Sequence, residues 1–259
     1  MKHELKATSR LLVPFYIALF CISIINHLTF NYGAEEGIFA LLTGFLFIIQ
    51  HLFIMAIVTG TAIFMIIRFY KNFLSDEGYL MFTLPVSIHQ LILSKLIIAL
   101  FWTIVSAIGA AVSWAIVISS INDISLINFS TAIMKDLFVE LNAEFGFRWV
   151  AISIELIVLG ILFLIGNILL TYASIAIGQL FKKYKIIASF GAYVVITTVL
   201  QFVGVAGIAS LGYIFQEHLV FIDKIPSMVL PIAIIIGLVG CAIFYVSTYY
   251  IFKRKLNLD

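Results

Sequence analysis

Six long apolar segments, separated by shorter polar stretches, organise this chain. Each is close to or above the roughly 20 residues that a helix needs to cross a bilayer core. None alternates as a membrane β-barrel strand does, and helices satisfy their own backbone polar groups in lipid. The pattern predicts an all-α, polytopic membrane protein, a single transmembrane domain over residues 1–259. The six predicted transmembrane helices are about 13–31, 38–67, 88–120, 149–178, 186–207 and 228–252.

The composition agrees with this class. The chain has 259 residues, of which 63% are hydrophobic and 11% charged, and its mean hydropathy is +1.19. A soluble domain is about half apolar and a quarter charged. The formal net charge of +2 is too small to indicate a nucleic-acid partner.

The sequence contains few motifs that indicate catalysis, nucleotide binding or metal binding. It contains no Gly-Lys pair, so the phosphate-binding loop of common ATPases is missing. Cys21 and Cys241 both fall in apolar runs, where we expect buried thiols rather than a disulfide. His51 has no second ligand at helical spacing that would hold a metal. We predict that the chain is not an enzyme and holds no metal or cofactor itself.

The basic residues predict the orientation. If the six helices alternate in direction, three cations lie on one side of the membrane, namely Lys135, Arg148 and Lys224. The other twelve of the 15 Lys and Arg share the opposite side. The positive-inside rule then places both termini in the cytoplasm. The twelve are Lys2, Lys6, Arg10, Arg68, Lys71, Lys95, Lys182, Lys183, Lys185, Lys253, Arg254 and Lys255.

Two flanking regions carry weaker patterns. Pro14 predicts a bend or restart in the first helix. Residues 2–12 then form either a short interfacial helix or a frayed terminus. In the outer connection 121–148, an apolar face predicts a surface helix with Ser130 as its cap.

A charged segment follows the second predicted helix. That helix has about 30 residues and a length of roughly 45 Å, which exceeds the thickness of the hydrocarbon core. Ser75 is a good helix cap, and Asp76 and Glu77 suit the positive end of a helix. Pro85 disfavours continuation of the helix beyond it. We therefore predict a short cytoplasmic helix at about 75–84. Ser87 and Gln90 then form a capping box that starts the third transmembrane helix.

A helix of this length is not stable alone in water. Its apolar residues therefore need a surface to dock on: Tyr79, Leu80, Met81, Phe82 and Leu84. The membrane interface and a groove on a cytoplasmic partner satisfy that need equally well. Physics alone leaves both open.

The segment Asp-Glu-Gly-Tyr-Leu-Met-Phe-Thr-Leu-Pro-Val resembles one in permeases of type-2 ABC exporters from low-GC Gram-positive bacteria. Those permeases have six helices, both ends inside, and an intracellular coupling helix at this place. Their longest outer segment usually lies between helices five and six, whereas here it lies between three and four. The local match runs from Arg68 to Lys95. It is carried by Glu77, Gly78, Leu80, Thr83, Leu84, Pro85, Ser87 and Lys95.

The resemblance implies several partners. A separate ATPase subunit, which holds ATP and Mg, would grip the coupling helix. A second permease subunit, identical or different, would complete a path across a bacterial plasma membrane. The cargo would be amphipathic: a peptide antibiotic or lantibiotic, a drug or a lipid. The residues implied in ATPase binding are Ser75, Asp76, Glu77, Gly78, Tyr79, Leu80, Phe82, Leu84 and Pro85.

Two other classes stay open. A non-transporting immunity or sensor component would use the same cytoplasmic helix to bind a partner. A secondary transporter is disfavoured, because the chain has no evident internal repeat or pair of broken helices.

Polar residues inside the predicted helices are candidates for a translocation path: Gln50, His51, Glu155 and Asn167. Each also has a structural interpretation. Gln50 and His51 sit where bonds between helices are common, and Glu155 is near enough to the outer end to reach the interface. Asn167 belongs to a predicted packing seam of mostly small residues. The seam is Gly160, Leu164, Asn167, Thr171, Ser174 and Gly178.

Overall fold

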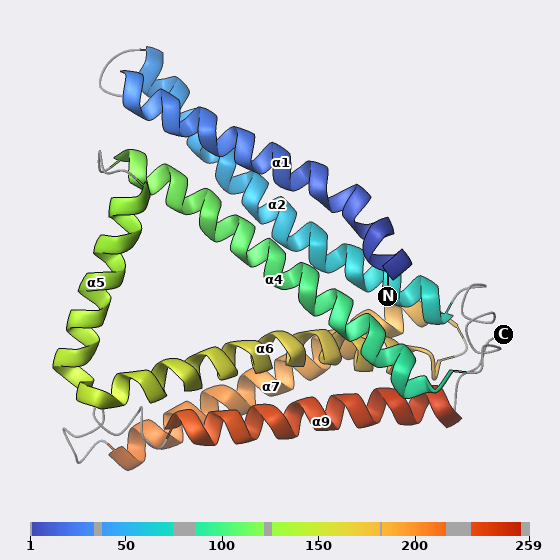
Figure 1. Ribbon diagram of the computed structural model, residues 1–259. Coiled ribbons are helices and arrows are strands. Elements are labelled where there is room, and N and C mark those ends of the chain that lie inside the picture. The colour runs from blue at the N-terminus through green and yellow to red at the C-terminus, as the bar shows by residue number, and fades with distance from the viewer. Residues whose placement is uncertain are drawn as a thin grey trace. The chain divides into compact units, whose positions relative to one another are not determined.

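The computed structural model describes residues 2–33, 38–74, 86–121, 126–181, 183–215 and 229–254. These residues are helical almost throughout, and no strand occurs among them (Figure 1). The helices are α1 (Lys2–Gly33), α2 (Ile38–Leu74), α4 (Ile88–Ile121), α5 (Leu126–Phe145), α6 (Trp149–Gly178), α7 (Lys185–Phe215) and α9 (Leu230–Arg254), with a 3-10 turn at Gly146–Arg148.

Six of these helices are long and apolar enough to cross a membrane, which confirms the predicted class. The last four candidate spans begin and end within two residues of the predicted bounds. The first begins eight residues earlier than predicted, and the second ends six residues later. The spans are Leu5–Phe30, Ala40–Phe73, Ile88–Ser119, Trp149–Gly178, Lys185–Gly207 and Leu230–Arg254.

The predicted restart at Pro14 is wrong, because α1 runs unbroken through this proline. Residues 2–12 are therefore neither a separate helix nor a frayed end. A proline removes one backbone donor, but packed neighbours can hold a membrane helix together around it. Leu12 and Tyr16 lie on either side of Pro14, and both are buried. Packing thus holds both halves of α1 in one helix.

The predicted helix in the connection 121–148 is confirmed as α5, but its start is not where we expected. The helix begins at Leu126, so Ser130 lies inside it and is not its cap.

The described helices belong to two compact units. Unit 1 comprises Met1–Met65 and Ile97–Phe147, and unit 2 comprises Ile66–Leu96 and Arg148–Asp259. Unit 1 therefore holds α1, α5 and the larger parts of α2 and α4. Unit 2 holds α6, α7 and α9 with the last residues of α2 and the first residues of α4.

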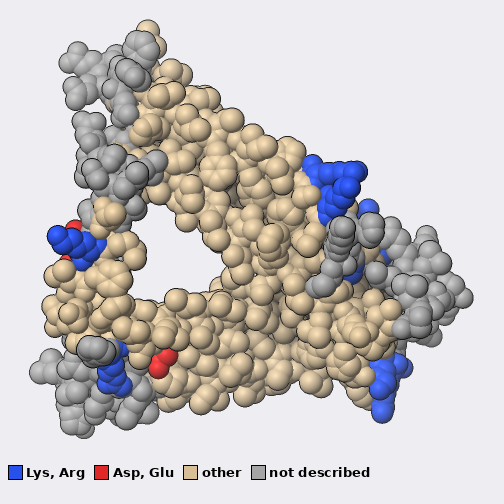
Figure 2. Space-filling view, in the orientation of Figure 1, with Lys and Arg blue, Asp and Glu red and all other residues tan. Residues whose placement is uncertain are grey.

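Within unit 2, α6 packs along both α7 and α9 (Figure 1). The outward faces of these helices are apolar and exposed, as Phe163 and Phe190 illustrate. Figure 2 shows mostly uncharged side chains along the visible flanks of α6 and α9, with one acidic side chain on α6 and with Lys and Arg near helix ends. Such a surface suits lipid rather than water.

Charge is unevenly placed within unit 2. The carboxyl ends of α2, α6 and α9 meet in one cluster of buried residues, and α7 begins a few residues after α6 ends. The cations at that end include Arg68, Lys71, Lys183, Lys185, Lys253 and Arg254. Arg148 precedes α6 at its opposite end. The positive-inside rule uses an asymmetry of this kind to orient a membrane protein. The cytoplasmic placement of both termini stays a prediction.

Candidate functional site

The predicted coupling helix at 75–84, with Pro85, lies outside the described residues. The structure does describe the helices that precede and follow it.

The preceding helix, α2, continues to Leu74, beyond the residue 67 at which we expected it to end. Its 37 residues correspond to about 55 Å, well above the thickness of a hydrocarbon core. One face of the added turns is packed against protein, because Phe69 and Phe73 are almost completely buried, while Lys71 is exposed. The extension is therefore held by packing within unit 2.

The following helix, α4, begins with the predicted capping box. The Ser87 backbone N–H donates to Gln90 Oε1 at 3.3 Å, and the Gln90 N–H donates to Ser87 Oγ at 3.4 Å. These reciprocal bonds satisfy backbone donors that a helix start leaves open. The start of α4 is thus defined directly after the segment 75–85.

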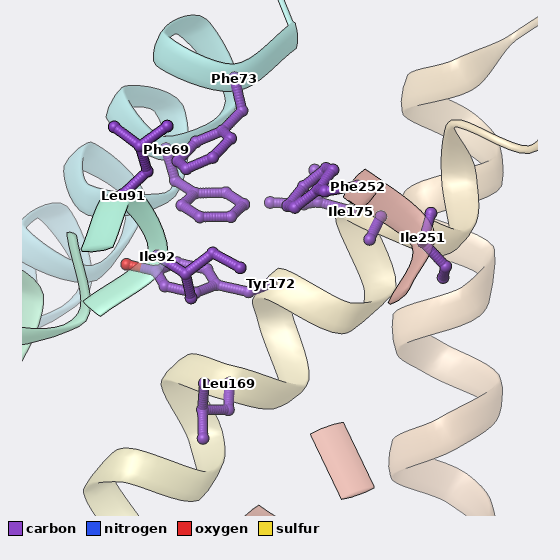
Figure 3. Packing of buried hydrophobic residues seen from close by; sticks show 10 residues of the cluster. Phe69, Phe73, Leu91, Ile92, Leu169, Tyr172, Ile175, Ile251 and Phe252 are labelled. Carbon is purple, nitrogen blue, oxygen red and sulfur yellow. The ribbon is translucent and has the colours of Figure 1, made fainter. Parts of the chain in front are cut away.

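An aromatic core joins both flanks to the rest of unit 2 (Figure 3). Phe69 of α2 stacks on Tyr172 of α6, with ring centroids 3.6 Å apart and planes 6° from parallel. Phe73 stacks on Phe252 of α9 at 5.1 Å. The core consists of Phe69, Phe73, Leu91, Ile92, Leu169, Tyr172, Ile175, Ala176, Ile251 and Phe252.

A second contact links α4 to α9. His89 Nδ1 lies 2.8 Å from the Tyr245 hydroxyl oxygen. The His89 ring also stacks on Tyr249, at 3.9 Å and 20°, and the Lys253 ammonium lies 5.4 Å from the centroid of the Tyr249 ring. Sequence reasoning missed this group. The one available signal was the spacing of Tyr245 and Tyr249, which places both on one face of a helix.

Gln50 lies at the centre of a polar network in unit 1, with 1% of its surface exposed. Its Nε2 donates to Ser113 Oγ at 3.0 Å and to the Ser113 carbonyl oxygen at 3.1 Å. Its Oε1 accepts from Asn26 Nδ2, and Ser23 and Ser113 share a 2.6 Å hydroxyl bond. The network joins α1, α2 and α4, as expected for polar residues that hold membrane helices together.

His51 is half-buried beside this network. Its Nδ1 lies 2.8 Å from the Phe47 carbonyl oxygen of its own helix. Its ring meets Trp114 of α4 edge to face at 4.7 Å and packs on Phe47 at 4.3 Å. These contacts place His51 in aromatic packing between α2 and α4.

The other two pathway candidates belong to unit 2. Glu155 of α6 is partly buried, and its Oε2 has no hydrogen-bond partner among the described residues. Asn167 is exposed, and its Nδ2 donates to the Phe163 carbonyl oxygen of the same helix at 2.8 Å. Twelve positions of helix separate Glu155 from Asn167 by about 18 Å. The four candidates therefore lie in two units, and a shared pathway role stays a prediction.

The predicted seam on α6 packs at one end only. Ser174 and Gly178 are buried, and Gly178 lies against Ser189 of α7. Gly160 has no atom within 4 Å of the place where a Cβ would stand, and Asn167 is exposed. Gly178 therefore allows α6 to come close to α7 at the end where the two helices are joined.

No group of three His, Cys, Asp or Glu side chains within the described ranges could hold a metal ion. Both cysteines are free thiols. The prediction that both are buried is wrong for Cys21, which is exposed on α1, while Cys241 is half-buried. An apolar run places a residue within the span without deciding whether it faces protein or lipid.

The described helices define an all-helical membrane protein with six candidate transmembrane helices. No protein-family model matches the chain, and no curated protein or solved structure matches it either.

Proposed function

We propose that this chain is the membrane subunit of an ATP-driven exporter of the type-2 ABC class. A separate ATPase subunit binds the segment 75–85, and a second permease subunit completes the path. The cargo is amphipathic: a peptide antibiotic or lantibiotic, a drug or a lipid. The complex works in a bacterial plasma membrane, with both termini of this chain in the cytoplasm.

One observation carries the proposal beyond the resemblance in sequence. The segment 75–85 is bounded by α2 and α4, and the flanking ends of both helices contribute to one aromatic core with α6 and α9. A partner that grips the segment therefore acts on the flanking ends of α2 and α4 and, through the core, on α6 and α9. This is the connection that a coupling segment requires, since ATP-driven movement has to reach the transmembrane helices.

The residues divide into two roles under this proposal. Glu77 and Gly78 belong to the gripped segment, where a carboxylate can accept charge-assisted hydrogen bonds from the partner. Phe69 and Tyr172 belong to the core that receives the movement. Tight packing transmits displacement because close-packed side chains have little free volume.

A non-transporting immunity or sensor subunit is the second candidate. It would use the same segment, and the same core would then relay binding of a ligand inward to a cytoplasmic partner. The two candidates differ in whether ATP turnover moves a cargo across the bilayer.

Purification from the encoding organism tests the proposal. An affinity-tagged chain is extracted in mild detergent, and the co-purified protein is identified and assayed for Mg-ATP hydrolysis in liposomes. We expect an ATPase subunit, with its binding weakened about tenfold by Glu77→Ala, as for the loss of one charge-assisted bond. Gly78→Pro should uncouple ATP hydrolysis while membrane insertion stays normal.

Lys135→Ala is the control, because Lys135 is exposed on α5 in unit 1. It should leave ATPase association and turnover unchanged. A purified chain without any ATPase partner contradicts the proposal, as do Glu77→Ala and Gly78→Pro variants that keep full association and turnover. An ATPase complex that hydrolyses ATP but drives no uptake of amphipathic cargo into inside-out vesicles favours the sensor candidate.

A further inference from the structure

We infer that His89 is a positioning residue that carries movement of the coupling segment to α9. The inference deepens the proposed function and rests on it. It assigns a role to a side chain that neither the resemblance nor the path candidates include.

His89 is held where such a role requires it. It lies between Ser87 and Gln90, the two residues of the capping box, and α4 begins at Ile88. A displaced segment 75–85 pulls on this first turn before it reaches any other part of α4. Since the capping bonds keep the turn intact, His89 moves with it.

The contacts of His89 lead to α9. Its Nδ1 is hydrogen-bonded with the Tyr245 hydroxyl at 2.8 Å, and its ring is stacked on Tyr249 at 3.9 Å. Tyr245 and Tyr249 are one turn apart, so one imidazole engages two successive turns of α9. The Tyr245 ring lies 5.8 Å from the His89 ring and 25° from parallel with it.

This contact differs in kind from the aromatic core. The core is close-packed and transmits displacement, but its apolar contacts are non-directional. A hydrogen bond needs both distance and angle, and it weakens steeply when either changes. The His89–Tyr245 bond therefore fixes the register of α4 against α9 in a way that the stacked phenylalanines do not.

The test follows hydrogen–deuterium exchange in the purified complex with its ATPase. Exchange in α9 is compared between the nucleotide-free complex and one trapped with Mg-ATP and orthovanadate. In the wild type we expect trapping to change exchange over residues 245–254. His89→Phe keeps a stacking ring without the ring nitrogen that bonds to Tyr245, and Tyr245→Phe removes the hydroxyl. Each should reduce the trapping-dependent change about fivefold, the equilibrium effect of one typical hydrogen bond.

Two further variants separate positioning from general stability. His89→Asn keeps a carboxamide that can donate or accept a hydrogen bond near the position of Nδ1, and it should restore the response of α9. His27→Phe is the matched control: His27 Nδ1 lies 3.2 Å from the Ile116 carbonyl oxygen within unit 1, which contains neither flank of the segment. It should leave the response of α9 at the wild-type level.

The outcomes distinguish failure of the role of His89 from failure of the proposed function. A wild-type complex whose α9 responds to trapping, with His89→Phe and Tyr245→Phe responding equally, overturns the role of His89 and leaves the proposed function intact. A chain that binds no ATPase removes the proposed function and the inference together. Loss of the response in both phenylalanine variants, with rescue by asparagine, supports the inference.

Discussion

Gly178 at the end of α6 and Ser189 in the first turns of α7 approach so closely that no side chain fits between them. A Cβ on Gly178 would stand 2.6 Å from the Ser189 backbone nitrogen and 2.7 Å from its Cα. Gly178→Ala therefore forces the backbones of the two helices apart. We expect a loss of about 1–3 kcal/mol, as for overpacking, measured as a lower midpoint of thermal unfolding in detergent.

Gly160→Ala is the control on the same helix, because nothing lies within 4 Å of its Cβ position. Alanine is a better helix former than glycine, so this variant should unfold at an equal or slightly higher temperature. Equal losses in both variants would show that the approach of α6 to α7 is not what makes Gly178 sensitive.

The buried amide of Gln50 should stabilise unit 1. Gln50→Leu leaves the Asn26 Nδ2 without its Gln50 acceptor and the Ser113 carbonyl without its Gln50 donor. We expect a loss of about 1–2 kcal/mol in thermal stability, the range for polar bonds between membrane helices. Asn167→Leu is the matched carboxamide control, because Asn167 is exposed and its described bond stays within its own helix. If Asn167→Leu costs as much as Gln50→Leu, the network is not the source of the effect.

The stack of Phe69 on Tyr172 should be among the most sensitive contacts of unit 2. Phe69 is 1% exposed, so Phe69→Ala opens a cavity in the aromatic core. A buried Phe-to-Ala change costs about 3–5 kcal/mol, which should show as a large fall in the unfolding midpoint. Phe163→Ala changes the same side chain at a position 70% exposed and should have little effect. A small loss at Phe69 would mean that unit 2 refills the space.

The capping box predicts a local effect at the start of α4. Ser87→Ala removes the oxygen that accepts the Gln90 N–H. The expected cost is about 1 kcal/mol, seen as faster amide exchange in the first turn of α4. Ser94→Ala is the comparison, since Ser94 Oγ donates at 2.8 Å to a carbonyl of the preceding turn, that of Leu91. Unchanged exchange at residues 88–91 in Ser87→Ala would contradict a stabilising cap.

Glu155 carries a buried carboxyl oxygen without a hydrogen-bond partner among the described residues. An unpaired polar atom in an apolar span costs stability, so Glu155→Leu should unfold at a temperature at least as high as the wild type. Glu140→Leu on the exposed face of α5 should change little. A clear loss in Glu155→Leu would reveal a stabilising partner, whereas higher stability with lost export would assign the carboxylate to the path.

The period and length of the apolar runs predicted most of the fold. Four spans were placed within two residues, because an uninterrupted apolar stretch bounded by charges leaves a membrane helix little freedom to end elsewhere. The Ser87–Gln90 capping box could also be predicted from sequence, because its two partners lie within one turn of each other. The expectation of a restart at Pro14 was wrong because the effect of a proline depends on packing, and Leu12 and Tyr16 are buried on both sides of it.

Local sequence thus determined the class of protein, the number of candidate transmembrane helices and the segment that resembles a coupling helix. Tertiary structure decided which polar residues meet: Gln50 with Ser113, 63 positions apart, and His89 with Tyr245, 156 positions apart. It also decided that Gly178 packs while Gly160 stays open on the same helix. The physical reason is that the pattern of apolar residues predicts which residues are removed from water, whereas the neighbouring helices determine what those residues contact.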